Sequence, residues 1–331
     1  MPLRLVEIIV PAAAVDALAQ LPSEQDVLGR WDDSLGDGKS LIRVLLSVEH
    51  SEAMLDDLER RFQHVEGFRV MLLPVEATLP RPPEATESGA SKKRKSPARV
   101  SREELYHDVA QGAKISGVFV AQVALATLVA AIGLLRDDTA VIIGAMVIAP
   151  LLGPNVSLSL ATTLGDTKLA LQSLKANAVG LGVALVVTLL IGELFAIDPS
   201  GHAIETRTHV SGGDILLALA SGCAGVLAFT SGASSALIGV MVAVALLPPF
   251  VVFGLLLTAG QLSAAGGALL LVATNVICVN ISGVLTFVVQ GLRPRTWWEA
   301  DRAKKTTRWA VATWALLLAI LCTLIFVATR R

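Results

Sequence analysis

Seven apolar runs follow one another beyond Lys114, and they constrain the fold more than any other feature of the chain. Each run approaches the roughly 20 residues that an α-helix needs to cross the hydrocarbon core of a bilayer. They cover residues 115–135, 139–162, 171–197, 213–231, 234–259, 264–290 and 308–328. Hydrophobic residues make up 53% of the 331-residue chain and charged residues only 17%. The sequence therefore predicts an α-helical polytopic membrane protein with about seven transmembrane helices.

The first 76 residues have a different character, with short β-rich runs separated by helical patterns. LRLVEIIV, SLIRVLLSVE and FRVMLLPVE are typical of strands, whereas SEAMLDDLERRF has apolar residues at helical spacing. A short helix follows the first strand, and a weak strand is expected near residues 26–31. This βαββαβ order predicts an α+β ferredoxin-like soluble domain over residues 1–76. The fold alone assigns no ligand.

A flexible linker and an interfacial helix are expected between this domain and the first span. Residues 77–100 are rich in Pro, Ser and charge and cannot form a core. Their KKRK stretch is better interpreted as a topology determinant and lipid-headgroup contact than as a nucleic-acid signal. Residues 101–114 carry a narrow apolar stripe of Leu105, Val109 and Ala113, which predicts an amphipathic helix on the membrane surface.

The distribution of Lys and Arg in the short loops predicts the orientation of the spans. One side has the basic linker, Lys168, Lys175 and six Lys or Arg residues between 293 and 308. The other side has Arg136, Arg207 and the final two arginines. The bias predicts a multi-pass protein of the cytoplasmic membrane, with a cytoplasmic N-terminal domain and the C-terminus outside.

An internal repeat links two of the apolar runs. IGAMVIAPLLGP, starting at Ile143, aligns with IGVMVAVALLPP, starting at Ile238, at an offset of 95 residues. Adding an insertion of three residues extends the alignment and sets Asn177 against Asn275. The repeat unit contains three spans, so the second unit starts on the opposite side of the membrane. We therefore expect two inverted transmembrane repeats, residues 115–197 and 213–290, followed by an additional transmembrane helix, residues 308–328.

Prolines interrupt the second span of each repeat, which is the best sequence indication of a transport site near the membrane midplane. If the segments are helical, Pro150 and Pro154 leave the carbonyls of Met146 and Pro150 without a donor. In the same way Pro248 and Pro249 free the carbonyls of Val244 and Ala245. Such carbonyls must meet protein, water or a ligand. The alternative is a kinked helix whose carbonyls are satisfied by neighbouring Ser, Thr or Asn side chains.

Polar side chains inside the spans are few, and three asparagines are the best candidates for ligand contact. The intramembrane polar residues are Gln122, Asn155, Asn177, Glu193, Asn275, Asn280 and Gln290. We select Asn155, Asn177 and Asn275, although each alone is also compatible with interhelical hydrogen bonding. In the soluble domain, Arg4, Arg43 and Arg69 lie near strand starts and form an anion patch if they share a face; otherwise they are solvent-facing strand residues.

A family resemblance is carried by three stretches of the sequence. ELYHDVAQGAKIS, AAIGLLRDDTAVIIGAMVIAPLLGP and SSALIGVMVAVALLPP resemble the "uncharacterised hydrophobic domain" family of bacterial and archaeal membrane proteins. The likeness covers roughly residues 100–290. It implies a polytopic membrane protein, often with a small soluble domain, and supplies no substrate or catalytic residue.

The function expected from these features is transport of an unknown small solute or ion through a transporter or channel. The alternative is a membrane sensor or scaffold whose soluble domain binds a ligand or partner. We expect no enzyme, since the chain has no HExxH or G-x-S-x-G motif and no intramembrane histidine. No cofactor, metal site or nucleic-acid partner is expected. Small residues on several spans favour close helix packing and a homo-oligomer in the lipid bilayer.

Overall fold

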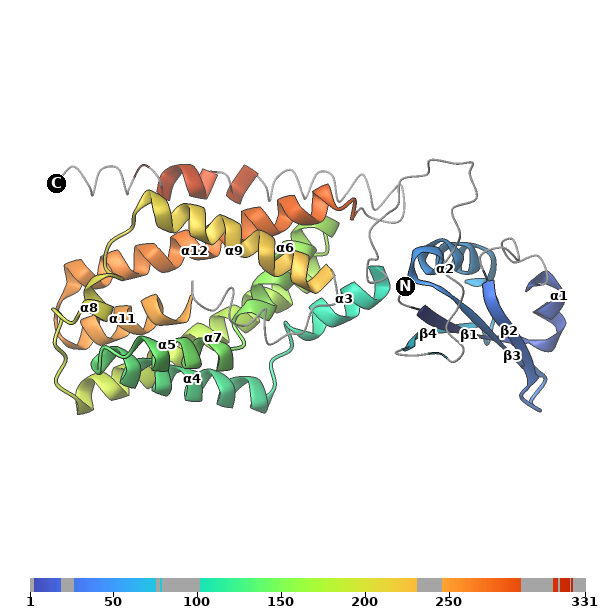
Figure 1. The fold of residues 1–331 in the computed structure, drawn as a ribbon, viewed down its shortest axis with the longest axis horizontal. Helices are drawn as coiled ribbons and strands as arrows, with labels where there is room; N and C mark the ends of the chain where they lie inside the picture. The colour runs from blue at the N-terminus through green and yellow to red at the C-terminus, as the bar shows by residue number, and fades with distance from the viewer. Residues whose placement is uncertain are drawn as a thin grey trace. The chain divides into compact units, whose positions relative to one another are not determined.

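The chain folds into two units, Met1–Glu104 and Leu105–Arg331, in the computed structural model (Figure 1). The structure describes residues 3–18, 27–75, 78, 102–230 and 246–292, together with residues 312–314, 316–321 and 323. The predicted linker 77–100 apart from residue 78, the carbonyls of Val244 and Ala245, and the basic loop between 293 and 308 therefore lie outside the described residues.

The first unit is a four-stranded antiparallel sheet with strand order β2-β3-β1-β4. Its elements follow the predicted βαββαβ order. They are β1 (Leu3–Pro11), the 3-10 turn η1 (Ala12–Ala14), α1 (Val15–Leu18), β2 (Val27–Ser34), β3 (Lys39–Ser47), α2 (Val48–Phe62) and β4 (Arg69–Val75).

Alternation along β1 determines which face of this sheet is buried. Val6, Ile8 and Val10 lie on one face and have no exposed surface, because successive strand residues point to opposite faces. They pack with Met54 and Leu58 of α2, which lie one helical turn apart. The helical spacing of the 51–62 segment is thus confirmed as a core-facing pattern.

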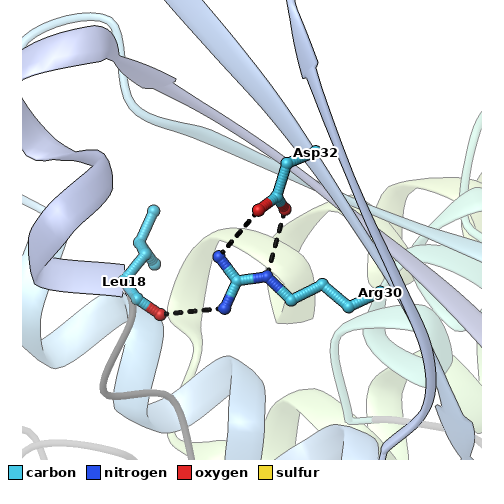
Figure 2. A network of polar contacts seen from close by, with 3 residues as sticks. All are labelled: Leu18, Arg30 and Asp32. Carbon is cyan, nitrogen blue, oxygen red and sulfur yellow. Dashed lines mark hydrogen bonds and ion pairs between the residues drawn. The ribbon is translucent and has the colours of Figure 1, made fainter.

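Arg30 of the edge strand β2 forms a bidentate ion pair with Asp32 of the same strand and also contacts the end of α1, as Figure 2 shows. Arg30 donates from Nε to Asp32 Oδ1 at 3.0 Å and from its second terminal nitrogen to Asp32 Oδ2 at 3.2 Å. Its other terminal nitrogen lies 3.5 Å from the carbonyl of Leu18. The planar fork of arginine matches a carboxylate in this way, so Asp32 orients the guanidinium toward α1.

The second unit is helical and strongly apolar. Its helices, including the segment that leads into it, are α3 (Arg102–Gln111), α4 (Gly117–Leu135), α5 (Thr139–Ile148), α6 (Leu152–Leu164), α7 (Thr167–Leu194), α8 (His202–Glu205), α9 (Gly212–Thr230), α11 (Leu247–Thr258) and α12 (Leu262–Val289). Among the residues that the structure describes, four helices are long and apolar enough to cross a membrane, namely α4, α7, α9 and α12. The α5–α6 pair makes a fifth span if its two helices cross together.

The count of seven spans is not confirmed by the described residues. The predicted span 234–259 begins in residues 231–245, which are outside them, and its described part is the shorter helix α11. The last apolar run is represented by a short helix, Ala312–Leu321. The structure establishes a membrane-type helical unit with four to five candidate spans.

The helix boundaries repeat at one constant spacing. α4 and α9 have 19 residues each, and α7 and α12 have 28 each. Each partner begins 95 residues later, from Gly117 to Gly212 and from Thr167 to Leu262. The helix boundaries therefore contain no insertion of three residues. The predicted pairing of Asn177 with Asn275 is corrected, because a constant offset sets Asn177 against Val272.

The helices form two sets, α4 to α7 and α9 to α12, which are related by this spacing. The two sets also begin at opposite ends of the unit. α4 starts after α3 and ends near α8, where Asp137 Oδ1 accepts a hydrogen bond from the Ala203 backbone N–H at 2.6 Å. α9 then starts after α8 (Figure 1). The start of α12 likewise lies near α8, since the backbone of Thr208 faces Gly267. The start of α7 lies beside α3, because Tyr106 of α3 donates a hydrogen bond to Asp166, the N-cap residue of α7.

The apolar stripe of α3 does not lie on a lipid surface. Leu105, Val109 and Ala113 are 3%, 1% and 0% exposed, and Ala113 packs against Ala161 and Leu169. The expected contact of this stripe with lipid is thus corrected, and the position of residues 101–114 at the membrane surface stays a prediction. The apolar face of α3 is covered by protein because α6 and α7 end and begin beside it.

Candidate functional site

The interruption of the predicted second span lies between α5 and α6, which are bent by 53°. α5 ends at Ile148, and Ala149 has extended backbone with ψ 117°. Pro150 and Leu151 form the turn, and α6 begins at Leu152. Because the N–H of Pro150 is missing and the proline ring opposes a helical conformation in the preceding residue, the sequence ends the helix at this point.

Pro154 does not break a helix. It lies in the first turn of α6, where backbone N–H groups have no intrahelical acceptor in any case. Pro248 and Pro249 lie in the first turn of α11 in the same way. The expectation that these three prolines each free a carbonyl within a continuous helix is corrected, since they open helices instead. Pro150 alone lies in the break.

α6 is enclosed along its length and carries an unusual set of polar residues. Asn155, Ser157 and Ser159 are each at most 1% exposed. Thr162 and Thr163 are also buried. At the offset of 95, α11 has Phe250, Val252 and Gly254 opposite the first three. Of the two corresponding helices, α6 therefore carries the buried polar residues and α11 does not carry them at these three positions.

A chain of amide hydrogen bonds joins α6 to α7 and α12. Asn155 Nδ2 donates to Asn177 Oδ1 at 3.0 Å and to the Leu151 carbonyl at 2.8 Å. Asn280 Nδ2 donates to Asn155 Oδ1 at 3.1 Å and to the Val276 carbonyl at 2.8 Å. Asn155 therefore occupies the centre of the chain, four residues after the break.

Ser159 continues this chain on the side of Asn280. Its hydroxyl lies 3.2 Å from Asn280 Oδ1 and 3.1 Å from the carbonyl of Asn155. It also packs against Gly283, where an added Cβ would approach the hydroxyl to 2.6 Å. The polar atoms of this region meet one another closely because glycine and serine allow α6 and α12 to approach.

The structure brings together some of the predicted site residues and separates others. Asn155 and Asn177 are in direct contact, with Pro150 nearby in the chain. Met146 is buried in the apolar core of the unit. Asn275 is buried on α12 and takes no part in the amide chain. Pro248 and Pro249 are buried at the start of α11.

The residue that sequence reasoning passed over is Asn280. The sequence places it among the intramembrane polar residues, but the assumed insertion of three residues favours Asn275. A stronger signal was available, because the whole chain has only four asparagines and all of them lie in the spans. They are Asn155, Asn177, Asn275 and Asn280, and three of them bond to one another.

α3 is held along α6 and against the start of α7. The Ser157 hydroxyl donates to the Val109 carbonyl in a short hydrogen bond. The backbones of Gly112 and Gly153 touch, since a Cβ on Gly153 would lie 2.7 Å from the Gly112 carbonyl oxygen. α3 therefore reaches the helix that carries Asn155, and only glycine at both positions permits this approach.

Tyr106 attaches the same helix to α7. Its hydroxyl donates to Asp166 Oδ2 at 2.7 Å, while Asp166 Oδ1 caps α7 by accepting from the Lys168 and Leu169 backbone N–H groups. This hydrogen bond, followed by partial burial and the charge of Asp166, raises the pKa of Tyr106 from 10.0 to about 12.

Titration of Tyr106 is expected to show this shift directly, because it is the single tyrosine of the chain. The folded protein holds the phenol proton more tightly than the unfolded chain does. Its stabilising contribution is therefore full below pH 10 and is lost as the pH rises through about 12. Tyrosinate absorbance should have its midpoint near pH 12, and Asp166→Asn should move the midpoint toward 10. An unchanged midpoint in that variant would exclude the carboxylate as the cause.

The structure does not gather the three arginines of the soluble unit into an anion patch. Arg4 shares the face of Val6 and Ile8, whereas Arg43 lies on the opposite face and pairs across β1 with Glu7. Arg43 Nε donates to Glu7 at 2.8 Å, and a terminal nitrogen donates to Asp33 at 2.7 Å. The hydrogen bond that Arg43 donates to Glu7 is the main reason that the pKa of Arg43 is raised. Arg69 lies on β4, opposite Ile9.

The chemistry available within the helical unit is neutral hydrogen bonding. In the described part of the chain, every buried polar side chain is an amide or a hydroxyl. Across the same residues, no three His, Cys, Asp or Glu side chains gather where they would hold a metal ion. The site can contact a ligand through amide groups, hydroxyls and backbone.

Comparison with known proteins identifies relatives at the level of sequence. Residues 146–281 match the family described as "Domain of unknown function (DUF389)", a segment that contains the bend, the amide chain and most of α12. The uncharacterized protein MJ0678 of Methanocaldococcus jannaschii is 34% identical over 326 residues, which cover 98% of this chain and 99% of that protein. No solved structure matches. With a relative this similar over nearly its whole length, the chain belongs to the DUF389 family of membrane proteins of unknown function.

Proposed function

We propose that the protein is a transporter or channel for a small solute, with its site at the break between α5 and α6. The observation that carries this proposal is the bent helix pair itself. It places an interrupted backbone and a buried amide chain side by side in the middle of an apolar unit. Interrupted helices in lipid are tolerated only where protein or a water-filled cavity surrounds them, and in transporters they form substrate sites.

An inverted repeat is part of the proposal, and three observations support it. The helix boundaries keep one offset, and the two sets of helices begin at opposite ends. In addition, the enclosed helix of each set packs against the last helix of the other set. Ser159 of α6 packs against Gly283 of α12, and Thr188 of α7 packs against Gly254 of α11. An offset of 95 converts the first pair of positions into the second. Each set thus packs its enclosed helix against the last helix of the other.

The proposed orientation places the α3 end of the helical unit on the cytoplasmic side. Lys168 lies at that end, and Arg136 and Arg207 lie at the α8 end. Burial lowers the pKa of Arg207, with the charge of Asp137 acting in the opposite direction. The wider bias rests on Lys and Arg of the linker and of the 293–308 loop. In a Ser200→Cys variant, the new thiol lies in the exposed loop before α8 and should react with an impermeant maleimide from outside intact cells.

Flux through reconstituted vesicles tests the proposed function. Proteoliposomes would be transferred into hyperosmotic solutions of formate, acetamide, glycerol or potassium salts. The recovery of vesicle volume would be followed by light scattering. Asn177→Ala is expected to reduce the initial rate at least about tenfold, since it removes an end of the amide chain beside the break. Gln172→Ala, an exposed position on the same helix, is the matched control. Equal rates in empty vesicles and proteoliposomes for every solute would overturn the proposal.

A sensor or scaffold remains the second candidate, and one observation favours it. Both amide protons of Asn155 and of Asn280 are used within the protein, as they would be in a purely structural network. In this case the soluble domain would bind a ligand or partner, and the vesicles would show no protein-dependent flux. In neither candidate do we propose catalysis. We propose that the protein acts as a homo-oligomer in the bilayer.

A further inference from the structure

The direction of the amide chain is fixed by two backbone carbonyls. A carbonyl oxygen only accepts, so the side-chain atom beside the Leu151 carbonyl must be the nitrogen of Asn155. The atom of Asn280 beside the Val276 carbonyl must also be its nitrogen. Each amide has one orientation as a result, and the exchange of oxygen and nitrogen that an isolated asparagine permits is excluded here.

These two constraints determine which atom of the Asn177 amide faces Asn155 and which one is left for another partner. Asn155 Nδ2 requires an acceptor on Asn177, so Asn177 turns its Oδ1 inward. Every bond of the chain then runs in one direction, from Ser159 through Asn280 and Asn155 to Asn177. Bonds aligned in this way polarise one another and strengthen the last donor.

The last donor is the Nδ2 group of Asn177. In the part of the chain that the structure describes, no atom accepts a hydrogen bond from it, and the side chain is partly exposed. Asn177 lies ten residues after the start of α7, which corresponds to roughly 15 Å along the helix. At such a depth an unpartnered N–H group costs several kcal/mol. A partner for it is therefore expected from outside these residues.

We infer that Asn177 binds a small ligand through a hydrogen-bond acceptor on that ligand, either an uncharged oxygen or a monovalent anion. Asn177 Oδ1 already accepts from Asn155, so the group that Asn177 leaves for a ligand without a partner is the Nδ2 donor. The inference names the ligand chemistry of the proposed transport site. Passage of this ligand through the protein rests on the proposed function, whereas its binding to Asn177 does not.

The four asparagines make a direct test possible. The full-length protein, labelled with ¹⁵N in asparagine side chains and placed in lipid bilayers, should give four side-chain amide signals in solid-state NMR. Asn177→Asp removes one signal and assigns it, while its carboxylate still accepts from Asn155. The probes are lithium, sodium and potassium formate as the anionic acceptor, and N,N-dimethylacetamide as the uncharged acceptor.

The expected result is a saturable shift of the Asn177 signal with formate, with dimethylacetamide or with both, independent of the alkali cation. A response to formate alone assigns the anion, and one to dimethylacetamide alone assigns the uncharged oxygen. Gln172→Glu, which adds the same negative charge on the exposed side of α7, should keep the response. No shift with either acceptor, or one that follows the identity of the cation, overturns the inference. A shift without flux in vesicles would instead overturn the proposed function and leave the binding site in place.

Discussion

Gly267→Ala is expected to destabilise the helical unit strongly, by roughly 3 kcal/mol, which is at the upper end for overpacking. An added Cβ at this position would overlap the carbonyl oxygen of Thr208. That atom belongs to the backbone of the loop after α8 and cannot rotate away as a side chain would. Either the loop or the first turns of α12 must move, and the junction between α8 and α12 would be lost.

The neighbouring glycine provides the control. Gly266 lies in the same helix, and a Cβ there would meet nothing within 4 Å. Gly266→Ala should be neutral or stabilising by up to about 1 kcal/mol, because alanine is the better helix former. The two variants would be compared by thermal unfolding in the same detergent. Equal midpoints would show that the contact of Gly267 with Thr208 does not stabilise the fold.

Asn155→Leu is expected to have the second large effect and to act on both stability and function. The substitution removes the bonds to Leu151, Asn177 and Asn280 together. It also leaves the buried Asn280 Nδ2 group with only one acceptor. Each interhelical bond in a membrane contributes about 0.6 to 1.7 kcal/mol, so a loss of roughly 2 to 3 kcal/mol is expected. Flux should fall at least as far as in Asn177→Ala.

A double-substitution cycle tests whether the hydrogen-bonded asparagines stabilise the unit through their mutual bonds or independently. If Asn155 and Asn280 act through their mutual bond, Asn280→Leu should cost less in the Asn155→Leu background than in the wild-type protein. The cycle would be measured from unfolding free energies in one detergent. Additive costs would mean that the two residues stabilise the unit independently and that their mutual hydrogen bond does not contribute to stability.

Parts of the fold were predictable because they depend on local periodicity. The alternation of Val6, Ile8 and Val10 and the helical spacing of Met54 and Leu58 need no tertiary information. The same parity places Arg4 on the buried face and Arg43 on the other. Strand parity in the sequence therefore already separates Arg4 from Arg43 and argues against an arginine patch.

The position of the break was predictable, but the role of each proline was not. Pro150 ends a helix by its own covalent structure. Whether Pro154 interrupts a helix or opens one depends on where the next helix starts, and that start depends on the packing of α6 among its neighbours. The role of α3 was missed for a similar reason. A narrow apolar stripe indicates burial but does not distinguish lipid from protein.

The sequence by itself determined that this is a membrane protein with an interrupted span, a second apolar segment 95 residues later and four asparagines within the spans. These properties follow from composition and spacing along one chain. Only the tertiary structure decided that Asn280, and not Asn275, joins Asn155, and that the chain ends with the amide nitrogen of Asn177. The physical reason is that a hydrogen bond requires atoms about 3 Å apart with a fixed direction. That geometry is set by how α6, α7 and α12 pack, which the order of residues does not specify.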